Sequence, residues 1–217
     1  ALWAGMQYAL FNSGPVTSNV VEGGAFWFAD GPDPQANPDL QFHFLCGAGA
    51  EAGVPSVPKG SSGITLNSYT LRPKARGSVT LQSSDPKANP IVDPNFLGHP
   101  DDLRVSVEGV KFSREIFSQP SLQKYIKDIR FPDRNVRTQA DFEAYARQYG
   151  RTSYHPTCTC KMGKDTMSVV DSQLRVHGLD GLRICDSSVM PSLVGSNTNA
   201  PSIMIGERAA DLIRGNR

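Results

Sequence analysis

Hydrophobic and polar positions alternate along the first part of the chain in a way that predicts strands. Residues 40–45 alternate apolar and polar side chains with a period of two, which is typical of a half-buried strand. Residues 23–28, 64–71 and 77–82 predict further strands, each bounded by glycine, proline or other turn-forming residues. Two prolines within residues 89–94 predict a turn there.

Longer stretches with helical periodicity predict four helices, over residues 1–12, 100–117, 138–150 and 202–214. The second has valines on one face and two aspartates in its first turn, where acidic residues favour a helix start. The last is amphipathic and is followed directly by Gly215, a common residue just past a helix end.

Near residue 150 the composition changes. Residues 169–171 and 181–186 predict two short strands around a turn. We therefore predict an α+β fold, with a mixed, largely antiparallel sheet and flanking helices in residues 1–150. Residues 151–217 are predicted to complete a second domain.

A glycine-rich stretch at residues 47–52 follows a predicted strand and mimics a dinucleotide-binding fingerprint. The fingerprint requires a helix after it, and Pro55 and Pro58 exclude one within two turns. We predict a mobile loop here instead.

The bulk composition is that of a globular protein. Of 217 residues, 39% are hydrophobic and 20% charged, and the formal net charge of +1 argues against nucleic acid as a partner. No run of apolar residues is long enough for a transmembrane helix. Because Ala1 is not a start methionine, we expect a fragment or processed product, from a cytoplasmic or membrane-peripheral protein.

Four cysteines are present. Cys158 and Cys160 are separated by one residue, which disfavours a disulfide between them. Their spacing from His155 lacks the second ligand pair of a zinc site, so we expect no metal and reduced, largely buried thiols.

Two segments of the last third carry candidate chemistry. Residues 154–163 include His155, which can accept a proton near neutral pH, and residues 195–201 include Asn197, just before the last predicted helix. Pro156 biases His155 toward an extended conformation at a strand end. A base, an amide and a positive helix end together can deprotonate a bound group and stabilise the anion. A histidine in a turn and a helix-capping asparagine are the alternative interpretation.

The sequence resembles the C-terminal half of glucose–methanol–choline (GMC) oxidoreductases, in the branch of choline dehydrogenases and long-chain alcohol dehydrogenases. The segments that carry the resemblance follow the family's order along nearly the whole chain, at residues 14–19, 72–81, 92–97, 155–163, 181–191 and 197–213. The resemblance implies that residues 1–150 form the substrate-binding domain. It also implies that residues 151–217 form the C-terminal part of the FAD-binding domain and carry the catalytic residues.

The same resemblance implies the reaction and its residues. These enzymes use FAD to oxidise a primary alcohol to an aldehyde, by removing the hydroxyl proton and passing hydride to flavin N5. His155 matches the proton acceptor and Asn197 the second catalytic residue. Matches to residues beside the cofactor are Ser153, Tyr154, Asp186, Ser187, Asn197 and Thr198. Matches in the substrate cavity are His43 and Phe26.

Two departures from the family pattern stand out. Cys158 replaces the glycine of many members, and we expect a small residue to be tolerated there. No convincing dinucleotide fingerprint lies within the sequence, so we expect the isolated chain to be colourless and inactive without the N-terminal half of the enzyme. Oxygen, a quinone or a dye would be the electron acceptor. Alternatives are a hydroxynitrile lyase on the same scaffold and a non-catalytic binding fragment.

Overall fold

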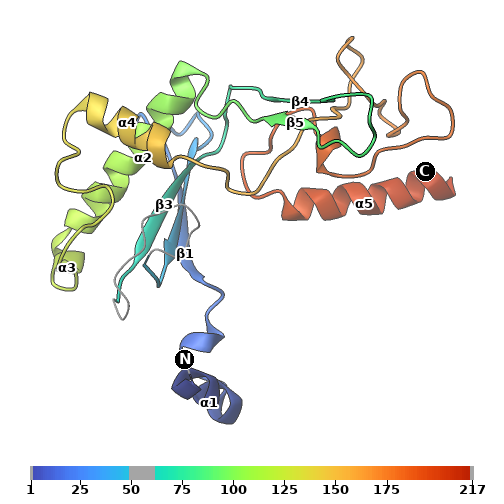
Figure 1. The fold of residues 1–217 in the computed structure, drawn as a ribbon. Helices are drawn as coiled ribbons and strands as arrows, with labels where there is room; N and C mark the ends of the chain where they lie inside the picture. Colours follow the sequence, from blue (N-terminus) through green and yellow to red (C-terminus); the bar gives the residue numbers. More distant parts are fainter. Residues whose placement is uncertain (1, 49–61, 216–217) are drawn as a thin grey trace. The chain divides into compact units, whose positions relative to one another are not determined.

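The computed structural model describes residues 2–48 and 62–215, and its helices and strands are drawn in Figure 1. The chain divides into two compact units. The first comprises Ala1–Thr70 and Val105–Tyr149, and the second comprises Leu71–Arg104 and Gly150–Arg217. The predicted α+β fold with antiparallel sheets and flanking helices is confirmed. The assignment of residues 1–150 to substrate binding and 151–217 to FAD binding stays a prediction.

An antiparallel three-stranded sheet forms the centre of the first unit, in the order β1-β2-β3. Its strands are β1 (Val21–Trp27), β2 (Leu40–Leu45) and β3 (Thr65–Thr70). Pairing runs from Leu40 opposite Thr70 to Leu45 opposite Thr65, and β1 pairs with the other edge of β2. Strand β2 is therefore central and has the most buried side chains. Leu40, Gln41 and Phe42 are all buried, so both faces are covered, whereas the alternating pattern predicted a half-buried strand.

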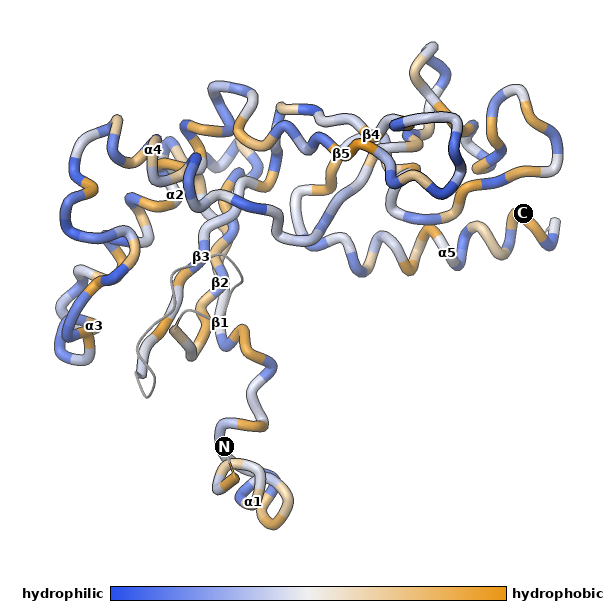
Figure 2. The backbone as a smooth tube through the Cα atoms, in the orientation of Figure 1, coloured by the Kyte–Doolittle hydropathy of each residue, from blue (hydrophilic) through white to orange (hydrophobic). Residues whose placement is uncertain are grey.

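Helix α2 (Pro100–Ser118) covers one face of this sheet. The helices of the first unit are α1 (Leu2–Phe11), the 3-10 helix η1 (Pro15–Thr17), α2 (Pro100–Ser118, from Val105 onward), α3 (Pro120–Gln123) and α4 (Gln139–Tyr149). Leu40, Phe42 and Val105 form a buried cluster, and the ring of Phe112 stacks on Trp27 with centroids 5.5 Å apart. Helix α2 is thus held against the sheet by aromatic and aliphatic contacts. Helix α1 buries none of its residues, and hydrophobic positions occur at several places along it (Figure 2).

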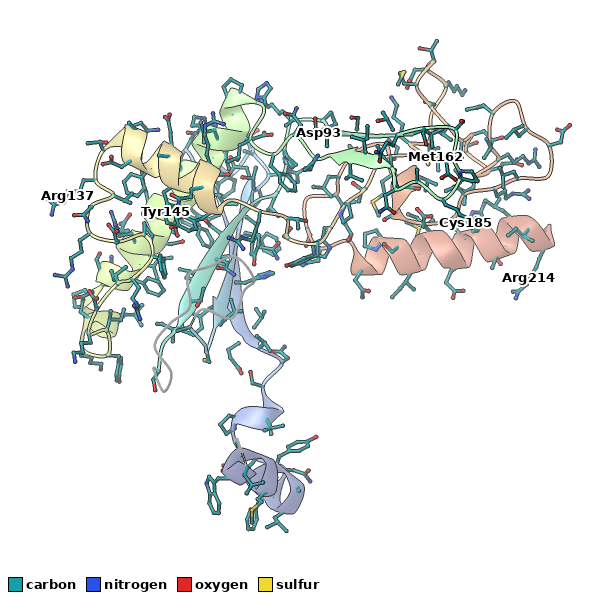
Figure 3. The ribbon with its side chains drawn as sticks, in the orientation of Figure 1. Asp93, Arg137, Tyr145, Met162, Cys185 and Arg214 are labelled. Atoms are coloured by element: carbon teal, nitrogen blue, oxygen red, sulfur yellow. The ribbon has the colours of Figure 1, made fainter. Side chains whose placement is uncertain are left out.

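The second unit contains a small hairpin and one long helix. Its elements are β4 (Ser78–Thr80), β5 (Ile91–Asp93), the 3-10 helix η2 (Ser187–Val189) and α5 (Asn199–Arg214), with the first turn of α2. Val170, Val189 and Ile205 belong to a buried core in which irregular segments pack against α5. Met162 and Cys185, labelled in Figure 3, lie on those segments and pack against the same core.

Several predicted elements are wrong in this unit. The predicted turn at residues 89–94 contains β5, because three of its residues pair with β4. The strands predicted at residues 169–171 and 181–186 are absent, and only isolated bridges form, such as Arg175 with Arg183. Apolar residues of these segments, such as Val170 and Ile184, pack in the core of the unit instead. Helix α5 begins three residues earlier than predicted.

Most of the glycine-rich loop predicted at residues 47–52 lies outside the described residues. All four cysteines are free, as expected, but Cys46 is exposed and the other three are half-buried rather than buried. No helix in residues 2–48 or 62–215 has the length and apolar character to cross a membrane.

Candidate active site

The side chains of His155 and Asn197 contact each other within the second unit. Asn197 Nδ2 lies 3.1 Å from His155 Nε2, although the two residues are 42 positions apart in the sequence. The other ring nitrogen, Nδ1, lies 2.6 Å from the hydroxyl oxygen of Thr198. The imidazole is therefore held at both nitrogens, and these three residues form the centre of the candidate site.

Helix α5 places Asn197 and Thr198 beside the imidazole. Thr198 is the N-cap residue of the helix and is buried. The backbone N–H and the hydroxyl of Ser202 both donate to the Thr198 carbonyl, at 3.0 and 2.7 Å. Further along, Ile205 and Ala209 are buried in the core. The start of the helix is thus fixed by its own hydrogen bonds and by packing one turn later.

The proline after His155 led us to predict that His155 lies at the end of a strand. This prediction is wrong, because His155 lies in an irregular segment. This segment bonds to the 3-10 helix η2 instead of to a sheet. The Ser187 hydroxyl donates to the Pro156 carbonyl at 3.2 Å, and the Met162 N–H donates to the Val189 carbonyl at 2.8 Å. The backbone on the C-terminal side of the imidazole is therefore tied to a second element of the same unit.

Left-handed backbone conformations occur on both sides of His155. Tyr154 has φ 63° and Cys158 has φ 73°, in a region where a side chain costs about 1–2 kcal/mol. A glycine, which the family resemblance led us to expect at position 158, would adopt this conformation without strain. Here the Cys158 thiol instead packs beside the core, 3.0 Å from the Thr157 hydroxyl. Strained residues of this kind cluster at functional sites.

The other residues predicted to contact the cofactor lie on the surface around this centre. Ser153 and Tyr154 are exposed, with 72% of Tyr154 accessible to solvent. Asp186 follows an irregular segment and not the strand that was predicted. Its carboxylate accepts a hydrogen bond from the Ser188 N–H at 2.8 Å, so it caps η2. Hydrogen bonds from the side chain and backbone of Ser188 lower the pKa of Asp186.

The two predicted cavity residues lie in the first unit and share one face of its sheet. His43 pairs with Gly24 in the strand register, and Phe26 pairs with Gln41. Since residues two apart on β2 point to the same face, Phe26 and His43 lie on the face opposite Phe42, which packs toward α2. Tyr69 contributes an aromatic ring there, 4.8 Å from the His43 ring.

The helix start gives the site a positive electrostatic character. The first N–H groups of α5 have no partner inside the helix, and the helix dipole adds about half a positive charge at this end. An anion that forms beside Asn197 would be stabilised by both. These groups fit a flavin, whose reduced ring carries negative charge on its pyrimidine side. Within residues 2–48 and 62–215 no cluster of His, Cys, Asp and Glu is suited to a metal ion.

Two contacts of the site were not predicted. The hydroxyl of Thr198 bonds to the imidazole, whereas the resemblance indicated only a place beside the cofactor. The hydroxyl of Ser187 bonds to the segment that carries the base. Thr198 lies four residues before the predicted start of the last helix, and nothing in the sequence indicated its bond to the imidazole.

Comparison with known proteins gives a consistent family match. A model of the GMC oxidoreductase family matches residues 73–206. The alcohol dehydrogenase (acceptor) of Pseudomonas putida is 42% identical over 207 residues, which cover 95% of this chain and 37% of that protein. The oxygen-dependent choline dehydrogenase of Sinorhizobium medicae is 42% identical over 215 residues, covering 98% of this chain and 38% of that protein.

Solved structures of flavoenzymes match as well. A formate oxidase of Aspergillus oryzae, from a study of FAD modification, has a TM-score of 0.84 and 26% identity, covering 98% of this chain and 41% of that chain. A fungal aryl-alcohol oxidase has a TM-score of 0.59 and 34% identity, covering 82% of this chain and 28% of that chain. The chain thus spans less than half the length of each of these proteins.

Proposed function

Since this chain belongs to the GMC oxidoreductase family, we propose that it forms the C-terminal part of an enzyme that oxidises a primary alcohol to an aldehyde with FAD. His155 is the base that accepts the hydroxyl proton, and Asn197 is its polar partner. The hydrogen bond between the two side chains, at 3.1 Å, is the observation that supports the proposal most strongly. It joins two residues that the family resemblance had marked independently.

Each residue of the site has a defined task in this reaction. FAD, when bound, supplies the acceptor for the hydride that leaves the alcohol carbon. Nε2 of His155 takes the proton from the alcohol hydroxyl, which Asn197 orients with its amide. The positive end of α5 stabilises negative charge that develops beside it. The resulting imidazolium adds a further positive charge at the site.

Substrate and acceptor are part of the proposal. Names of the matched proteins point to choline, other alcohols and aryl alcohols as candidate substrates. Oxygen, a quinone or a dye would reoxidise the cofactor, in the cytoplasm or at a membrane surface. Phe26 and His43 are the predicted contacts for the substrate's non-reacting part.

We test this function with the FAD-loaded enzyme, an electron-acceptor dye and a panel of choline, primary alkanols and benzylic alcohols. An alcohol oxidoreductase reduces the dye and releases the aldehyde in equal amounts. A hydroxynitrile lyase on the same scaffold would release an aldehyde from a cyanohydrin and leave the dye oxidised, and that result would contradict the proposal.

Residues outside this chain supply much of the cofactor site in our proposal, because the chain spans only 37% and 38% of the length of its two dehydrogenase relatives. The 217 residues expressed alone therefore retain no FAD and show no turnover. Gel filtration after mixing with FAD checks this, and a flavin absorbance band that co-elutes with the chain would contradict it.

A further inference from the structure

The Thr198 hydroxyl forms a hydrogen bond with the imidazole of His155. Its oxygen lies 2.6 Å from Nδ1, and the threonine is only 7% exposed. A hydroxyl can either donate a hydrogen bond to Nδ1 or accept one from Nδ1–H, so the distance alone does not show which group is the donor. The contact at the other ring nitrogen, Nε2, shows which group donates.

Asn197 determines which nitrogen of the imidazole carries the hydrogen. Its Nδ2 group, which only donates, faces His155 Nε2 at 3.1 Å. Nε2 therefore presents its lone pair, and in the neutral ring the hydrogen must be on Nδ1. Nδ1–H then donates to the Thr198 oxygen. This tautomer follows from the amide orientation assigned to Asn197.

The Thr198 side chain makes no capping bond to the helix that it precedes. Threonine at an N-cap position ordinarily accepts a hydrogen bond from a backbone N–H of the first turn. Thr198 occupies that position in α5 and makes no such side-chain bond. Its hydroxyl is instead directed at an imidazole 43 positions earlier in the chain. The backbone of Thr198 is already helical (φ −89°, ψ −1°), so its side chain is not placed to cap and its hydroxyl is left for the imidazole.

We infer that Thr198 is a positioning residue for the base. By accepting the Nδ1 hydrogen, its hydroxyl stabilises the tautomer that the Asn197 contact selects. In this tautomer the Nε2 lone pair, which accepts from the Asn197 amide in the structure, passes to the substrate hydroxyl when the alcohol binds. The Nδ1–H bond persists after Nε2 has taken the proton, because an imidazolium donates from both nitrogens. This inference rests on the proposed function of His155 and adds a residue to it.

Substitutions at Thr198 in the FAD-loaded enzyme distinguish the effect of its hydroxyl on the reaction rate from the effect of its methyl group. Thr198→Val has nearly the same shape and no hydroxyl, so kcat for flavin reduction falls about 10- to 100-fold while KM changes little. Thr198→Ser keeps the hydroxyl and stays within about threefold of the parent. Thr198→Ala, which also lacks the hydroxyl, replaces the valine variant if that variant does not fold. Thr157→Val is the matched control, because the Thr157 hydroxyl contacts Cys158 and not the imidazole.

The tautomer is also measured directly, by nitrogen NMR of the enzyme labelled with ¹⁵N-histidine. The His155 signals are identified by their loss in His155→Gln. The parent shows the hydrogen on Nδ1, and Thr198→Val shows a mixture or the hydrogen on Nε2. Parent-like turnover and an unchanged tautomer in Thr198→Val would overturn the inference, as would a Thr198→Ser variant as slow as the valine variant. Full turnover in His155→Gln would instead overturn the proposed function itself.

Discussion

Replacing Asn197 with aspartate would put a carboxylate oxygen where an amide nitrogen now lies 3.1 Å from the base. The side chains have the same shape, so the change replaces an N–H donor by a charged acceptor without a change in packing. A carboxylate favours the protonated imidazole, which cannot accept a proton from the substrate. We therefore expect the acidic limb of the pH–rate profile of flavin reduction to move to higher pH.

The structure sets the size of this displacement. Two unit charges 4 Å apart interact by about 1 kcal/mol in water and by about 4 kcal/mol near a protein surface, and about 1.4 kcal/mol corresponds to one pH unit. Asn197 is exposed and His155 half-buried, so solvent screening places the effect at the lower end, at about one to two pH units. At a pH on the acidic limb the rate then falls about 10- to 100-fold, and it recovers in alkaline solution.

Stopped-flow flavin reduction across pH 5 to 10 measures the displacement. The matched control is Asn199→Asp, which adds the same charge at the first residue of α5, where an acidic residue favours the helix. The control profile should lie close to that of the parent. An acidic limb in Asn197→Asp that stays in place or moves to lower pH would refute the reasoning.

Two further predictions concern stability, measured by urea unfolding of the chain. In Gly109→Ala the new Cβ would lie 2.8 Å from Ser68 Oγ, so unfolding free energy falls by about 1–3 kcal/mol, whereas Gly206→Ala, with open space around it, gains about 0.5–1 kcal/mol. Equal effects of the two would contradict the packing of α2 on the sheet. In Asp186→Asn the cap loses its charge but keeps an acceptor for the Ser188 N–H, so the cost at pH 7 is about 0.5 kcal/mol or less at this exposed position. Because hydrogen bonds from Ser188 lower the folded-state pKa of Asp186, its contribution is complete above the unfolded value of 3.8 and is lost as pH falls through the folded value. An Asp186→Asn difference that does not shrink as the pH falls below 3.8 would contradict this.

The parts of the fold with a strong periodic pattern could be predicted from the sequence. Strand β2 was expected at the residues where it occurs, and α2 within one residue of its observed end, because alternation and helical spacing both reflect one buried face. The C-terminal strands could not be predicted correctly. Val170 is fully buried, which its apolar neighbourhood did indicate, but its segment forms only isolated bridges. Burial alone does not determine whether a segment joins a sheet.

The residues of the candidate site could be predicted from the sequence, but the hydrogen bonds between them could not. His155 and Asn197 were marked by family resemblance and by their chemistry, since no periodicity relates residues 42 positions apart. The segment that carries the imidazole has left-handed conformations at Tyr154 and Cys158, which the sequence does not specify for residues other than glycine.

The central claim is that His155 removes the hydroxyl proton of an alcohol, and substitution of this residue tests it most directly. His155→Ala in the FAD-loaded enzyme should reduce flavin about 10²- to 10⁴-fold more slowly, with FAD content unchanged. His177→Ala, which removes a histidine bonded to the Gly163 carbonyl in the same unit, should retain the parent rate. Flavin reduction by His155→Ala at a rate close to that of the parent would contradict the account.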